Sequence, residues 1–238
     1  MLFLLIFTLA LTTGFAVLFY ALDSREKEPV KYILLAIAYG FVAAMLELFV
    51  FRVAFLKFFY GDQLFEFTLL LNDEIDQPNL IEATISAVVV GGFLKEGLKV
   101  FAFSQLVRRI KLEIDEPFDS IVYAVMVSLG FQLFENLLFV RTEFVTANFF
   151  GFMGLLKHLI CGVVMGYFHQ QYFFRSPYQT TKTIYVVFAV MVQMCVHIVL
   201  RLSLIWHSIF SYFLAAAFFV VGLLVVSKLI IDTKKLNT

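Results

Sequence analysis

Charged residues, prolines and cysteines are all scarce in this chain of 238 residues. Asp, Glu, Lys and Arg make up 15% of it, against about 25% in a typical soluble domain. So little charge excludes a soluble enzyme, a nucleic-acid-binding module and a disordered protein. The 18 basic and 18 acidic residues balance, so nothing implies a polyanionic partner such as nucleic acid.

Cysteine is present only twice, as Cys161 and Cys195. Both cysteines lie inside apolar runs, where neither a disulfide framework nor a cysteine-based zinc site is expected.

Apolar residues are abundant instead, at 62% of the chain with 31 phenylalanines. They form about seven stretches, most of them long enough to span a bilayer: 1–22, 32–55, 80–107, 118–141, 150–174, 183–204 and 207–231. Polar and apolar residues do not alternate in them, which favours helices over a membrane barrel. We therefore predict an all-α polytopic helix bundle of about seven transmembrane helices, in which residues 1–238 form one membrane-embedded domain. The first stretch lacks a basic leader, so we expect it to be a retained span.

The distribution of Lys and Arg predicts the orientation in the membrane. Eleven basic residues fall in loops on one side if there are seven spans, and four fall on the other side. The first group lies in the 23–31, 108–117 and 175–182 loops and in the tail. This split predicts an N-terminus outside and a C-terminus in the cytoplasm.

Ionisable residues inside the apolar stretches are candidates for function, because charge in a bilayer is costly. They are Glu47, Lys95, Glu96, Lys99, Glu135, Lys157, His158, His197 and Arg201. Glu96, Glu135, His158 and His197 lie at similar depth in four successive stretches. We expect these four side chains to meet inside the bundle.

Each of these residues also has a structural interpretation. Glu96 and Lys99 are three residues apart and share a helix face. They form either an internal ion pair with a structural role or a catalytic carboxylate base that is held by the neighbouring ammonium group. Glu135 has no basic neighbour in its own stretch, so it finds a partner across the bundle, stays protonated or binds a metal.

Small residues follow a four-residue spacing in the 150–174 stretch, at Gly154, Gly162 and Gly166 with His158 in the same register. This spacing predicts a close helix contact, with His158 either hydrogen-bonded in the contact or presented to a site. A polar stripe at four-residue spacing consists of Gln193, His197 and Arg201. It either holds neighbouring helices together through hydrogen bonds or forms one wall of a polar site. Two His and two Glu suit zinc or a glutamate-activated water, but the HExxH spacing is absent.

The segment from Glu116 to Asn136, with Gly130-Phe131 and Glu135-Asn136, resembles the PrsW family of intramembrane proteases. This family belongs to the wider group of type II CAAX prenyl endopeptidases and bacteriocin-processing enzymes. The other parts of the pattern match Glu96 with Lys99, His158 with its spaced glycines, and His197. Asp23 and Glu28-Pro29 are similar to the family's first loop. The resemblance covers roughly residues 23–201.

The resemblance implies an intramembrane endopeptidase of the bacterial cytoplasmic membrane. Its expected substrate is a single-span membrane protein such as an anti-sigma factor, cut near the outer leaflet in a wet cavity. It implies Glu96, Glu135, His158 and His197 as catalytic residues. The supporting residues it implies are Lys95, Lys99, Asn136 and Arg201.

Lys95 and Arg201 stand where the family pattern has an acidic residue or a possible one. Two extra cations disfavour a divalent metal such as zinc at Glu135, His158 and His197. A glutamate-activated water, with Glu96 as the base, fits better. The alternatives are an inactive pseudoprotease that binds a helix or lipid and, from the same buried Glu and His residues, a proton-coupled transporter.

Overall fold

The computed structural model describes residues 2–23, 26–52, 92–139, 144–175, 191, 195 and 209–235. These residues form helices and contain no strand, as predicted for an all-α chain. The helices are α1 (Leu2–Leu22), α2 (Val30–Leu46), η1 (Glu47–Arg52), α6 (Lys95–Arg109), α7 (Pro117–Phe139), α8 (Phe144–Gln170), η3 (Gln171–Arg175) and α10 (Ile209–Lys234).

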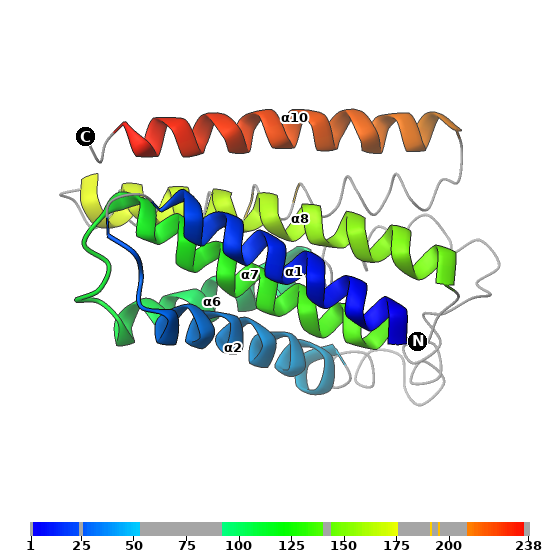
Figure 1. Ribbon diagram of the computed structural model, residues 1–238, viewed down its shortest axis with the longest axis horizontal. Coiled ribbons are helices and arrows are strands. Elements are labelled where there is room, and N and C mark those ends of the chain that lie inside the picture. Colours follow the sequence, from blue (N-terminus) through cyan, green and yellow to red (C-terminus); the bar gives the residue numbers. More distant parts are fainter. Residues whose placement is uncertain are drawn as a thin grey trace.

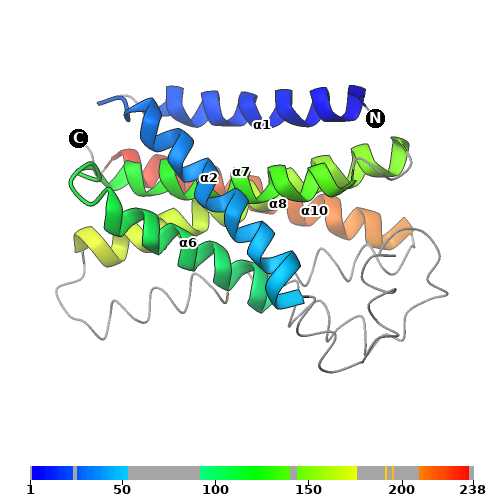
Figure 2. The same cartoon turned by 90° about the horizontal axis from the view of Figure 1, so that it is seen from below.

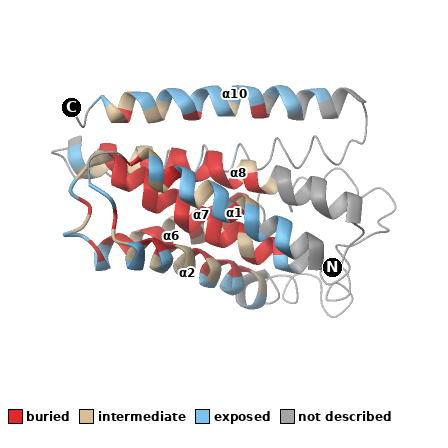
Figure 3. Ribbon diagram, in the orientation of Figure 1, coloured by how far each residue is buried: buried red, intermediate tan, exposed pale blue. Residues whose placement is uncertain are grey.

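Helix α7 occupies the centre of the bundle and packs against α1, α2, α6, α8 and α10 (Figure 1). It is buried along nearly its whole length, whereas α10 exposes most of its surface (Figure 3). The central helix begins with Pro117, which suits the first helical position because no partner is needed for its missing N–H. The carboxylate of Asp119 accepts hydrogen bonds from the backbone N–H groups of Asp115 at 3.1 Å and Glu116 at 2.7 Å. These bonds fix the turn between α6 and α7.

Glycines let the backbones of α2 and α7 approach closely, where α2 crosses α7 obliquely in Figure 2. A Cβ on Gly40 would overlap the backbone carbonyl of Val127, and one on Gly130 would overlap that of Ile37. The contact predicted from the glycine spacing in α8 is confirmed too. A Cβ on Gly162 would lie 2.9 Å from the Cα of Val125, and one on Gly166 would lie 2.4 Å from the Cα of Ile121.

The polarity of the bundle is inverted relative to a soluble protein. Leu34, Phe213 and Leu224 are 62%, 71% and 66% exposed, whereas Glu96 and Lys99 are completely buried. Large exposed apolar surface around a buried charged cluster is the arrangement expected in lipid.

Two of the described helices are long and apolar enough to cross a bilayer, Val30–Phe49 and Pro117–Leu137, and Leu9–Leu22 is a shorter apolar helix. The expectation of about seven spans and of a single domain stays a prediction. The predicted stretch 183–204, apart from Met191 and Cys195, and most of 56–94 lie outside the described residues.

Candidate functional site

A continuous chain of polar side chains links α6, α7 and α8 inside the bundle. Helix α6 contributes Lys95, Glu96 and Lys99, α7 contributes Glu135, and α8 contributes His158. Glu96, Lys99 and His158 have no exposed surface, while Lys95 and Glu135 are 9% and 8% exposed. Charged groups this deep are stable only when they are paired.

The pairing runs from one helix to the next without a break. The Nζ of Lys99 lies 2.6 Å from Oε2 of Glu96 and 3.1 Å from Nδ1 of His158. The Nε2 of His158 lies 2.8 Å from Oε2 of Glu135. The ammonium of Lys95 then donates to the other carboxylate oxygen, Oε1 of Glu135.

These contacts assign the tautomer of His158. An ammonium has no acceptor, so Lys99 donates to Nδ1, and Nε2 must carry the proton that is donated to Glu135. Two carboxylates and two ammonium groups then alternate along the chain, with a neutral imidazole between them. The charges of these five paired groups sum to zero, and Lys157 on α8 adds a further basic side chain close to Glu135 and His158.

An aromatic ring packs on this cluster, and two buried amides lie near Glu135 in the sequence of α7. The ring of Phe131 stacks on His158 with centroids 5.6 Å apart, and the Nζ of Lys99 lies 5.5 Å from the centre of the same ring. The amide of Gln132 donates to Oδ1 of Asn136, one turn along α7. Both α7 amides are buried beside the cluster.

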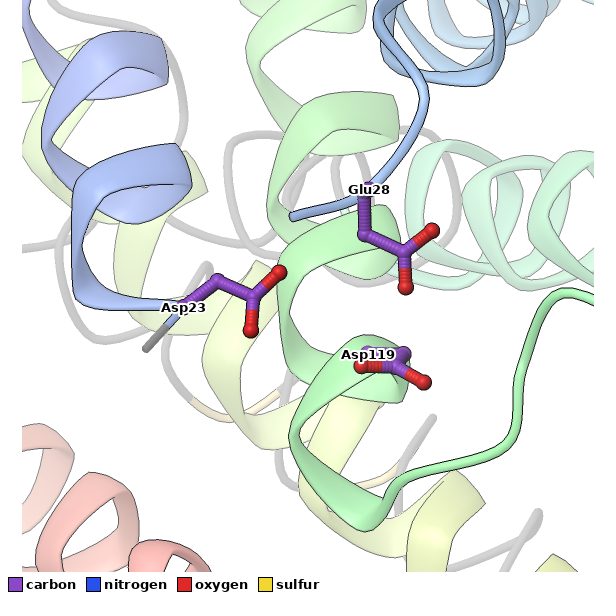
Figure 4. A group of neighbouring side chains, drawn as sticks. All are labelled: Asp23, Glu28 and Asp119. Carbon is purple, nitrogen blue, oxygen red and sulfur yellow. The ribbon is translucent and has the colours of Figure 1, made fainter. Parts of the chain in front are cut away.

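A second polar cluster lies at the opposite end of α7 (Figure 4). It consists of Asp23, Glu28 and Asp119, whose nearest carboxylate oxygens lie within 4.8 Å of one another. The hydroxyl of Tyr123 donates to Oε2 of Glu28. Burial raises the pKa of Asp23, and it raises the pKa of Glu28 to about 7, against the opposing effect of the Tyr123 hydrogen bond.

The sequence matches the family described as "PrsW family intramembrane metalloprotease" over residues 28–227. The chain belongs to the PrsW family. It is 28% identical to "Protease PrsW" of Geobacillus kaustophilus (strain HTA426) over 172 residues, which cover 72% of this chain and 65% of the relative. It is 28% identical to "Protease PrsW" of Bacillus subtilis (strain 168) over 166 residues, which cover 68% of this chain and 66% of the relative. The chain thus spans slightly less than two thirds of the length of these curated relatives. No solved structure matches it.

The PrsW family assignment confirms the resemblance read from the motifs. The structure brings together three of the four predicted catalytic residues, Glu96, Glu135 and His158, along with Lys95 and Lys99. Asn136 lies beside them on α7. His197, Arg201 and Gln193 lie outside the described residues.

Two structural alternatives are decided by the geometry. Glu96 and Lys99 do form an internal ion pair, which leaves a catalytic role open because a base also needs a fixed position. Glu135 finds its partners across the bundle, in Lys95 and His158. Neither contact could be located from sequence spacing.

The name of the PrsW family implies a metal, and the described part of this cluster does not fit one. Both carboxylate oxygens of Glu135 and both ring nitrogens of His158 are engaged by protein groups. A zinc ligand needs a free lone pair on carboxylate or imidazole, and two ammonium groups beside the site oppose a divalent cation.

The acidic cluster of Asp23, Glu28 and Asp119 was not predicted as a unit. In the sequence, Asp23 and Glu28 belong to the loop that is similar to the PrsW family's first loop, and Asp119 lies in the 116–136 segment. A signal was available, since Asp119 and Tyr123 are four residues apart and share a helix face.

Proposed function

We propose that the protein is an intramembrane endopeptidase that hydrolyses a membrane protein by a glutamate-activated water. The observation that carries this proposal is the buried chain from Glu96 through Lys99 and His158 to Glu135, built from three helices. Membership of the PrsW family supports the same reaction class.

Glu96 acts as the general base in this proposal. Lys99 contacts its Oε2 at 2.6 Å and thereby fixes the direction of the carboxylate. A water held by Glu96 gives up one proton to the carboxylate as its oxygen attacks the scissile carbonyl carbon. His158, held between Lys99 and Glu135, helps to fix Lys99 beside this carboxylate.

The tetrahedral intermediate carries its negative charge on the former carbonyl oxygen. His197, with Asn136 and Arg201, would donate hydrogen bonds to this oxyanion. The proton held by Glu96 then passes to the leaving amine nitrogen as the C–N bond breaks. Water is consumed, and one carboxylate and one amine terminus are formed.

The substrate that we propose is a single-span membrane protein, such as an anti-sigma factor, cut near the outer leaflet. The host membrane is the bacterial cytoplasmic membrane, with the N-terminus outside. The depth of the cluster supports this, because Glu96 and Glu135 lie in the half of the bundle away from the basic loops.

Water must reach a cluster that is completely buried at Glu96, Lys99 and His158. Hydrolysis therefore requires an opening of the bundle around α6 and α8 when the substrate binds. Intramembrane charges that serve catalysis line such water-filled cavities.

A pseudoprotease is the second candidate, and the Lys95–Glu135 pair favours it. The lysine neutralises a carboxylate that would otherwise hold water or a metal. Such a protein would keep the fold and bind a transmembrane helix without cutting it.

The test is cleavage of a library of tagged single-span proteins by the purified chain in liposomes. We expect wild type to cut at least one member, Glu96→Gln to cut none, and Glu26→Gln, an exposed carboxylate on the first loop, to cut as wild type does. A chelator should leave the rate unchanged. Cleavage that survives Glu96→Gln would refute the assigned base, and binding of a library member without any cleavage would favour the pseudoprotease.

A further inference from the structure

The three carboxylates at the other end of α7 form no direct ion pair within the described residues, unlike those of the first cluster, and Lys27 and Lys234 act on Asp23 only at a distance. Asp23, Glu28 and Asp119 are 1%, 5% and 2% exposed. Lys27, the nearest lysine in sequence, donates to the backbone carbonyls of Tyr20, Ala21 and Asp23. Lys234 lies over the ring of Phe118. Within the described residues, neither lysine bonds to one of the three carboxylates.

An oxygen of Asp23 supplies a second, independent observation. Its Oδ2 atom is buried and has no hydrogen-bond partner. Figure 4 shows the Asp23 side chain directed toward the space between Glu28 and Asp119. A buried carboxylate oxygen without a donor is costly, and buried charges in proteins are paired or coordinate metals.

The other two residues present oxygens to the same space. Tyr123 engages Oε2 of Glu28, and the turn before α7 engages Oδ2 of Asp119. The side chains of Glu28 and Asp119 also hydrogen-bond to each other and so share a proton that a bound cation would displace. The three groups converge within 4.8 Å. Such second contacts are what hold metal-ligating carboxylates in position.

We propose that Asp23, Glu28 and Asp119 form a binding site for a hard divalent cation. The site joins the α1–α2 loop to the start of α7. Oxygen-only ligands select Mg²⁺, Mn²⁺ or Ca²⁺ over zinc or copper. Three carboxylates with water completing the shell are sufficient for any of the three.

This site is separate from the proposed catalytic cluster and does not depend on the proposed function. Asp119 and Glu135 are sixteen residues apart on one helix, which is about 24 Å along its axis. The cation would stabilise the packing of α1, α2 and α7. Its effect is therefore measured as a change in the unfolding temperature and as the number of bound ions.

The test uses the full chain in detergent, first stripped with a chelator and then titrated with Mg²⁺, Ca²⁺ or Mn²⁺. We expect at least one of these ions to raise the unfolding temperature of wild type by at least about 5 °C at a hundredfold excess over its Kd. Asp23→Asn and Glu28→Gln should abolish the shift. Glu26→Gln, on the same loop but exposed, should retain it.

The variants separate a cation site from a purely structural cluster. Without divalent ions, Asp23→Asn should unfold at or above the temperature of wild type, because it removes one of three crowded carboxylates. Paramagnetic resonance should count one bound Mn²⁺ per wild-type chain and none per Asp23→Asn chain. A wild-type unfolding temperature that no ion raises, or a shift that persists in both Asp23→Asn and Glu28→Gln, would overturn the proposal.

Discussion

Lys95 stands at a position where the PrsW family pattern has a glutamate. Its ammonium group places a positive charge beside Glu135. The pair is nearly buried, so its attraction is strong and the removal of one partner leaves the other charge poorly compensated. Because Lys99 is already paired with Glu96, Lys95 is the group that forms the ion pair with Glu135.

The coupling of Lys95 and Glu135 can be measured directly. Lys95→Met should lower the free energy of unfolding by about 3–5 kcal/mol, because it strands a buried carboxylate. Adding Glu135→Gln should recover part of that loss. Chemical or thermal unfolding of both single variants and the double variant checks this. Lys111→Met, at an exposed position, is the control, and strictly additive losses at 95 and 135 would contradict the pairing.

Glu28 makes stability depend on pH. Its pKa in the folded chain is about 7 against an ordinary 4.5, with burial as the main cause and Asp23 raising it further. The folded state therefore holds a proton that the unfolded state releases. This contribution to stability is complete below about pH 4.5 and is lost as the pH rises through about 7.

With a chelator present, the unfolding temperature of wild type should fall between pH 5 and pH 8 by more than that of Glu28→Gln. The glutamine cannot titrate, so only the remaining groups of the cluster, Asp23, Asp119 and Tyr123, contribute to its slope. Scanning calorimetry at several pH values measures the difference, with Glu26→Gln as the control. Parallel curves for wild type and Glu28→Gln would contradict the raised pKa.

Single helices follow closely from the apolar stretches. The predicted span 118–141 is α7 at Pro117–Phe139, and 207–231 is α10 at Ile209–Lys234. The partners of the polar groups do not follow in the same way. Lys95 and Glu135 are forty residues apart, and hydrophobicity sets the length of a helix but not its rotation against a neighbour. Packing contacts such as Gly40 against Val127 set that rotation.

The contact of α2 with α7 should therefore tolerate no side chain at its glycines. Gly40→Ala and Gly130→Ala each place a Cβ into the backbone of the facing helix, and each should cost about 1–3 kcal/mol or more. Gly14→Ala, with open space around it, should be neutral or stabilising by up to about 1 kcal/mol. Unfolding measurements in detergent compare the three, and equal effects at Gly14 and Gly40 would contradict the packing.

At the scale of the whole molecule, the basic loops gather at one end. The α1–α2 loop, the α6–α7 turn and the C-terminal end of α10 lie together in Figure 1. A hydrogen bond of 3.4 Å from Tyr32 to Glu113 and one of 2.8 Å from Gln170 to Thr233 join segments at this end. The charge count predicted these loops on one side of the membrane, and the fold places the described ones together.

Cysteines at Glu26 and Leu112, both exposed, should react with an impermeant maleimide only from the cytoplasmic side. The parent would carry Cys195→Ser, because Cys195 is exposed and Cys161 is buried. Labelling of inverted vesicles but not of intact cells is the expected result. Reaction of both positions from outside would reverse the orientation, and reaction from opposite sides would contradict the shared end.

The alternation of two ammonium groups and two carboxylates has a further electrical consequence. A transmembrane voltage does about 2.3 kcal/mol of work per 100 mV on one elementary charge carried across the bilayer, and almost none on a neutral group that moves as a unit. The paired groups of the cluster, whose charges sum to zero, would therefore add almost no voltage dependence to the proposed opening of α6 and α8, and any voltage dependence would come from other charges such as Lys157.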